Sequence, residues 1–181
     1  MKQIYVCKRP ENSLLRECMY RDFSDSFAMT LNNPNITIDE VVNCFFTTSP
    51  NIVVRIMQLR DFMVRCVGLK TGAFVKDKEA LSFKPGTGQG LFKMYQCNEH
   101  EAIVGSDDKH LNFRTSLYVK PSGRKTEVLI STVVVVNNNL GNCYLKVVAP
   151  FHKMMVRLIM KNMYEALMEL NPGKKERILA V

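Results

Sequence analysis

An alternation of period two is the first clear pattern in this chain of 181 residues, between residues 22 and 31. One phase of the alternation carries Phe23, Asp25, Phe27, Met29 and Leu31, and the other carries mostly small or polar residues. This period is typical of a half-buried strand. The following Asn32-Asn33-Pro34-Asn35 predicts a turn that ends the strand.

Two helices are predicted after this strand. Thr37-Ile38-Asp39-Glu40 is a capping-box sequence, and apolar residues at helical spacing follow it as far as Phe46. Ser49-Pro50 predicts the start of a second helix that runs to about Val67. Arg60 falls in the middle of the apolar side of this second helix, where a charge requires a partner or an aqueous cavity.

Residues 68–91 contain five of the nine glycines and predict a long mobile loop. Within it, Gly86-Thr87-Gly88-Gln89-Gly90 differs from a dinucleotide fingerprint, because a strand-like segment and not a helix follows it. We therefore interpret this run as a flexible loop. A flap that covers the mouth of a cavity is the functional alternative.

Four strands and a long helix complete the pattern. The strands are expected at about residues 91–97, 102–106, 111–119 and 126–136, with short turns typical of an antiparallel meander. The helix ends at Asn171-Pro172-Gly173, and Pro150 inside it predicts a kink or a break. Its apolar stripe consists of Leu140, Tyr144, Val147, Val148, Phe151, Met154, Met155, Leu158 and Ile159.

This order of elements predicts an α+β fold of the helix-grip type. A curved antiparallel sheet would wrap around the long, kinked C-terminal helix, with two shorter helices after the first strand. Residues 1–19 are expected to form an N-terminal arm, residues 20–170 the domain, and residues 171–181 a basic tail. A sheet and helix arranged in this way enclose a space that is usually apolar with a few polar groups.

Composition narrows the possible functions. The net charge is +8, but the basic residues are scattered and accompany no nucleic-acid motif, so no nucleic-acid binding is predicted. No apolar run approaches the ~20 residues of a membrane span. The six cysteines stand at least eleven positions apart, which gives no zinc pair. Without a recognisable signal peptide, we expect free thiols and a cytoplasmic location.

Candidate binding residues fall on one predicted strand and on the last helix. His110, Asn112, Arg114 and Tyr118 share one strand face, which would supply polar groups to a cavity or would simply face solvent. As a structural alternative, Arg114 would pair with Asp25 or Asp107 inside the fold. The helix and the preceding elements add Arg60, Tyr144, Phe151, His152 and Met155. The three histidines fit no metal template, so no metal site is predicted.

Several stretches resemble an uncharacterised bacterial domain family, and the most specific is Asp107-Asp108-Lys109-His110-Leu111-Asn112-Phe113-Arg114. The others are Asp25-Ser26-Phe27, Leu59-Arg60-Asp61, Gly68-Leu69-Lys70 and Pro150-Phe151-His152. The family occurs alone or behind atypical short-chain dehydrogenase modules, and it is similar to START, pollen-allergen-like and polyketide-cyclase proteins. The resemblance, over about Tyr20 to Leu167, implies a helix-grip fold but no reaction. The family usually has Asp where Asn112 stands, so no acid–base role is expected at that position. No dinucleotide-binding module precedes the resemblance, so no cofactor is expected.

Three functions follow as hypotheses. The first is a module that binds a hydrophobic or amphipathic small molecule, whose polar end meets Arg114, His110 and Arg60. The second is a cyclase or dehydratase that uses His110 or His152 as general base and Arg114 to stabilise an enolate. The third is a protein-interaction domain with a filled core, and a homodimer is compatible with each of them.

Overall fold

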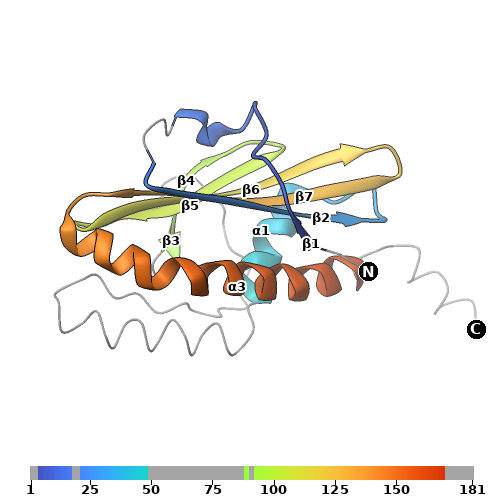
Figure 1. Ribbon diagram of the computed structural model, residues 1–181. Coiled ribbons are helices and arrows are strands. Elements are labelled where there is room, and N and C mark those ends of the chain that lie inside the picture. The colour runs from blue at the N-terminus through green and yellow to red at the C-terminus, as the bar shows by residue number, and fades with distance from the viewer. Residues whose placement is uncertain (1–3, 18–20, 49–87, 90–91, 170–181) are drawn as a thin grey trace, which may run out of the picture.

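The computed structural model describes residues 4–17, 21–48, 88–89 and 92–169, and a single antiparallel sheet lies at its centre (Figure 1). Seven strands are ordered β1-β2-β7-β6-β5-β4-β3 in this sheet. Their bounds are β1 Ile4–Val6, β2 Phe23–Leu31, β3 Gly88–Gln89, β4 Phe92–Cys97, β5 Glu101–Asp107, β6 Leu111–Ser122 and β7 Lys125–Val136. Strands β4 to β7 form the predicted meander, and β2 pairs with the last strand, β7.

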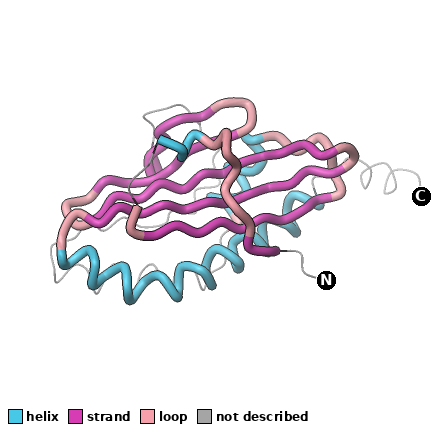
Figure 2. The backbone as a smooth tube through the Cα atoms, turned by 45° about the horizontal axis from the view of Figure 1, so that its top comes forward, coloured by secondary structure: helices cyan, strands magenta, loops and turns pink. Residues whose placement is uncertain are grey.

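The two faces of the sheet are covered by different parts of the chain. The helices α1 (Ile38–Thr47) and α3 (Asn139–Glu169) lie against one face, which we call the inner face (Figures 1 and 2). The N-terminal segment, with a short 3-10 helix η1 (Leu14–Glu17), crosses the opposite or outer face. The main core therefore lies between the inner face and the helices, and alternate residues of β2, β5, β6 and β7 enter it.

The predicted capping box begins α1 as expected. The Thr37 hydroxyl accepts a hydrogen bond from the backbone N–H of Glu40, whose carboxylate in turn accepts one from the backbone N–H of Thr37. This reciprocal pair satisfies two N–H groups that a helix terminus otherwise leaves open. The apolar side of α1 is buried, with Phe45 and Phe46 in edge contact at 5.2 Å between ring centroids.

Helix α3 is continuous through Pro150, and its axis bends along its length (Figure 1). The predicted apolar stripe is wrong for part of the helix. Val147, Phe151 and Met154 are 56%, 53% and 45% exposed, and the buried positions are Gly141, Val156, Ile159, Met160, Met163 and Leu167. The difference lies in the first half of the helix, where Leu145, Val148 and His152 face the cavity and turn Val147 and Phe151 outward, whereas Ile159 of the predicted stripe does enter the core.

The predicted α+β class is confirmed, and so are the strand at residues 23–31, the meander and the long helix. Two details differ. Part of the arm, Ile4–Val6, adds strand β1 to the sheet edge, and Gly88–Gln89 pairs with β4 although a loop was predicted there. The predicted second helix with Arg60, most of the loop at 68–91 and the tail at 171–181 lie outside the described residues.

A buried carboxylate joins the N-terminal segment to the outer face. Glu101 on β5 is 1% exposed and accepts hydrogen bonds from the Ser13 hydroxyl at 2.6 Å, the Leu14 backbone N–H at 2.7 Å and the Ser116 hydroxyl. Hydrogen bonds to an ionised acceptor are about twice as strong as neutral ones. Glu101 therefore fixes residues 13–14 on the sheet.

Candidate pocket between the sheet and the last helix

A cavity of about 170 Å³ lies between the inner face and the first half of α3. Its lining is mainly apolar and includes four phenylalanine rings, those of Phe23, Phe45, Phe92 and Phe113. Phe92 makes edge contacts with Phe45 at 5.9 Å and with Phe113 at 5.6 Å between ring centroids. These T-shaped contacts fix the ring orientations, so the wall of the cavity is preformed.

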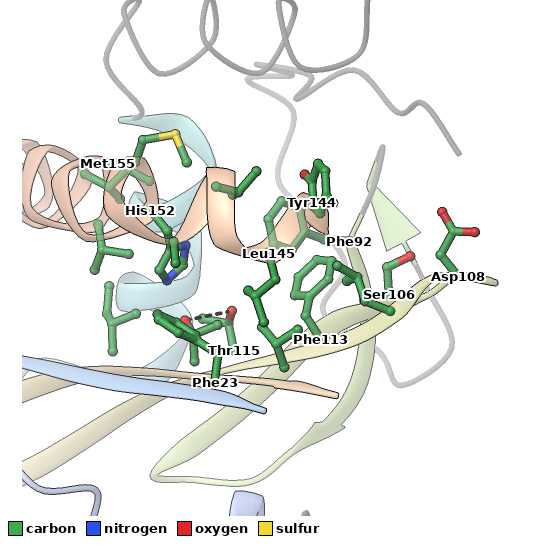
Figure 3. Close-up of a pocket in the computed structure, with 18 of the residues that line it drawn as sticks. Phe23, Phe92, Ser106, Asp108, Phe113, Thr115, Tyr144, Leu145, His152 and Met155 are labelled. Atoms are coloured by element: carbon green, nitrogen blue, oxygen red, sulfur yellow. Dashed lines mark hydrogen bonds between the residues drawn. The ribbon is translucent and has the colours of Figure 1, made fainter. Parts of the chain in front are cut away.

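Two threonine hydroxyls interrupt the apolar floor of the cavity. Thr115 on β6 and Thr132 on β7 are direct cross-strand neighbours, and their Oγ1 atoms lie 3.4 Å apart (Figure 3). Both residues are buried, and both line the cavity. Only one hydroxyl can donate in the bond between them, so the other keeps its hydrogen for a bound molecule.

Asp25 extends this polar row onto the next strand. It is the cross-strand partner of Thr132, and its side chain is 7% exposed. Its Oδ1 lies 3.4 Å from Nε2 of His152 on α3. Phe23, two positions earlier on β2, meets the His152 ring edge to face at 5.7 Å. His152 is thus held between a carboxylate and an aromatic ring, and it borders the cavity (Figure 3).

Near His110, contacts at the start of α3 tie this helix to the loop before β6. Asn138 accepts a hydrogen bond from the backbone N–H of Gly141 at 2.9 Å and caps the helix. Its amide also donates to the Lys109 carbonyl at 3.1 Å and lies 3.0 Å from Nδ1 of His110. His110 lines the cavity and is therefore tied to the helix cap.

The predicted site residues divide into three groups. Those that line the cavity are His110, Tyr144, His152 and Met155. The inner-face alternation of β6 consists of Leu111, Phe113 and Thr115, so Asn112, Arg114 and Tyr118 lie on the outer face, away from the cavity. Phe151 is exposed, and Arg60 lies outside the described residues.

Arg114 belongs to a surface cluster on the outer face, as the structural alternative with Asp107 expected. Its guanidinium lies 2.8 Å from Asp107 Oδ1, donates to the Phe113 carbonyl at 2.8 Å and stacks 3.6 Å from the centre of the Tyr95 ring. Burial acts to raise the pKa of Asp107, but hydrogen bonds from Tyr95 and Arg114 and the charges of Arg114 and Lys93 outweigh it, so that pKa is lowered. This cluster fixes the start of β6 from the outer face, and it reaches the cavity-lining residues Phe113 and Ser106 through their backbone carbonyls.

Asn112 and Tyr118 also hold the outer face together. The Asn112 side-chain oxygen accepts hydrogen bonds from the Asp108 backbone N–H and from the Asn137 amide, both at 3.2 Å. The Tyr118 hydroxyl accepts a hydrogen bond from the Asn12 amide at 3.1 Å. Their contacts explain a polar strand face without a ligand.

Three residues of the site were missed from the sequence: Thr115 and Thr132, which line the cavity, and Asp25, which lies behind His152. Asp25 carried a usable signal, because it occupies the apolar phase of the β2 alternation between Phe23 and Phe27. The threonines carried none, since threonine is common in strands and only their pairing across β6 and β7 brings them together.

Comparison with known proteins identifies a family whose function is unknown. A family model described as "Protein of unknown function (DUF2867)" matches residues 20–159. The chain belongs to this family. No curated protein matches the chain. In the part of the family domain that the structure describes, no helix is long and apolar enough to cross a membrane, and no group of three potential metal ligands occurs.

Proposed function

We propose that this DUF2867 domain binds a small, largely apolar molecule in the cavity, with one polar group of that molecule directed at His152 and the threonine pair. The observation that carries the proposal is the composition of the lining: phenylalanine and aliphatic walls surround a short polar row of Thr115, Thr132 and His152. Small-molecule sites typically combine such walls with a few polar groups that orient the ligand.

The size of the cavity supports a ligand with one or two rings. Its volume of about 170 Å³ is slightly above that of engineered apolar cavities of ~150 Å³, which bind benzene. The arrangement of a curved antiparallel sheet over a long C-terminal helix also supports a relationship with the helix-grip proteins, START domains among them. A fold alone indicates no ligand, so the lining carries the proposal.

Native mass spectrometry of the purified full chain tests for a retained ligand, against the same sample after denaturation. As a defined probe, 5-nitrobenzotriazole is then titrated into the delipidated protein and followed by NMR. We expect saturable shifts of cavity residues such as Thr115 and Val134. No retained mass together with no saturable shift would contradict the proposal.

Two substitutions on α3 give a matched pair for this test. Ala149→Phe adds a ring to the cavity lining, whereas Val147→Phe adds the same ring at a position that is 56% exposed. Occupied space should abolish probe binding in Ala149→Phe and leave it unchanged in Val147→Phe. Equal binding by the two variants would place the probe outside the cavity.

A further inference from the structure

Asp25 and His152 leave polar atoms without hydrogen bonds inside the protein. Both carboxylate oxygens of Asp25 and Nε2 of His152 are buried, and none of the three makes a hydrogen bond in the described part of the chain. Their contact of 3.4 Å is an ion-pair distance without hydrogen-bond geometry. Buried polar atoms of this kind weaken a fold, so an isolated unsatisfied group calls for an explanation other than stability.

The order of the two groups points toward the cavity. His152 lines the cavity, whereas Asp25 lies behind it on β2. Nε2 faces the carboxylate, so Nδ1 on the other edge of the ring remains for a bound molecule. A carboxylate behind an imidazole that faces the substrate is the arrangement that activates a base in many enzymes. Such contacts are often long in the unliganded enzyme and shorten when substrate binds.

From this geometry, and resting on the proposed binding function, we infer that His152 is a general base and Asp25 its positioning residue. The substrate class is a neutral, apolar β,γ-unsaturated carbonyl compound with an acidic Cα–H bond. Nδ1 of His152 takes the Cα proton, the C–H electron pair passes into a conjugated dienolate, and Asp25 stabilises the imidazolium. The same proton returns to Cγ of the dienolate, so the double bond moves into conjugation with the carbonyl group and the overall reaction is an isomerisation without a co-reactant.

The threonine pair completes the site. One hydroxyl of Thr115 and Thr132 donates to the other, and the remaining hydrogen can be donated to the enolate oxygen. His110 is less suited to the role of base, because its Nδ1 is engaged with Asn138 at the edge of the cavity. The mainly apolar walls favour a neutral substrate.

Ring opening of 5-nitrobenzisoxazole tests for such a base without knowledge of the natural substrate. The base removes the C3 proton, the C–H electrons form a nitrile, the N–O bond breaks, and the released nitrophenolate is measured by absorbance. The full chain is compared with His152→Gln, Asp25→Asn and, as the control, His100→Gln on an exposed turn. Occupancy is measured separately with 5-nitrobenzotriazole, which cannot open.

We expect turnover that falls about 10²-fold in His152→Gln. In Asp25→Asn we expect kcat to fall at least about 10-fold with KM unchanged, because the asparagine no longer stabilises the imidazolium. His100→Gln should match the parent protein. Equal rates for the parent and His152→Gln, with the benzotriazole bound, would overturn the inference and leave the binding function intact. Failure of the benzotriazole to bind, together with no retained mass in native mass spectrometry, would instead contradict the proposed function.

Discussion

Two buried carboxylates, one on each face of the same sheet, have opposite surroundings. Glu101 on the outer face accepts hydrogen bonds from Ser13, Leu14 and Ser116. Asp25 on the inner face accepts none among the described residues and has His152 as its ionic neighbour. Both side chains are at least nine-tenths buried, so the difference lies in their partners and not in their solvation.

This difference separates a group that stabilises the fold from one that the fold must tolerate. A buried carboxylate with three donors can contribute to stability, whereas one without donors costs free energy. Proteins keep such costly groups mainly at sites where activity depends on them. The inner face is therefore where we place function, and the outer face is where the N-terminal segment is attached.

The largest loss of stability is expected when Glu101, the carboxylate with hydrogen-bond donors, is removed. Glu101→Ala should lower the free energy of unfolding by about 4 kcal/mol, because it leaves two buried hydroxyls and the half-buried Leu14 N–H without an acceptor. Urea unfolding measures the loss, and hydrogen exchange at Leu14 should accelerate. Glu99→Ala, an exposed position in the preceding turn, is the control. A loss in Glu101→Ala no larger than in Glu99→Ala would refute this role.

A smaller effect is expected where α3 approaches the loop before β6. A Cβ atom on Gly141 would lie 2.0 Å from the backbone oxygen of His110, so Gly141→Ala must push the helix start away. We expect a loss of about 2 kcal/mol despite the better helix propensity of alanine, together with weaker probe binding in the cavity. Gly123→Asn serves as the control, because its φ of 60° suits asparagine and no atom lies within 4 Å. A stable Gly141→Ala with full binding would contradict the close contact.

Lowering the pH should remove the contribution to stability of the outer cluster of Asp107, Tyr95 and Arg114. The pKa of Asp107 is lower in the folded than in the unfolded chain, so the folded state resists protonation. Its contribution to stability is present above the ordinary aspartate pKa of about 3.9 and is lost as the pH falls through the lower folded value. Between pH 6 and pH 2, unfolding midpoints of Asp107→Asn should fall less steeply than those of the parent. Parallel curves would exclude this contribution.

The smallest stability effect is expected at Asp25. Asp25→Asn removes a buried charge that receives no hydrogen bond, so the free energy of unfolding should stay within about 1 kcal/mol of the parent or rise. The same urea titration as for Glu101→Ala measures it, and the two values together test the comparison directly. A loss at Asp25 as large as that at Glu101 would mean that the His152 ion pair is structural.

The fold could be predicted from local patterns, because strands and helices are determined by the spacing of a few neighbouring residues. The alternation at residues 23–31 and the capping box at Thr37 and Glu40 need no distant partner to be recognised. The direction of the polar face on β6 could not be predicted, because either face of an alternating strand can meet the core until its neighbours are known. The buried side of α3 was missed for a similar reason, since nearly continuous apolar residues give a broad stripe without a defined centre.

The candidate site was only half predictable. His152, Tyr144 and Met155 were found because they lie on the long helix that was expected to cover the sheet. Arg114 was favoured because a guanidinium suggests an anion site, but an equally good partner, Asp107, lay seven residues away. Asp25 acquires its meaning only from His152, which is far away in sequence.

The pairing of β2 with β7 also determines when the cavity can exist during synthesis. Ser26 and Ser131, hydrogen-bonded at 2.9 Å across these strands, are 105 positions apart. At translation rates of about 5–20 residues per second, strand β2 waits on the order of 5–20 s before its partner is made. Throughout that interval the apolar side of β2 stays exposed, because the neighbouring strand of the sheet is missing. Residues 23–31 are therefore a segment to which a chaperone of nascent chains would bind.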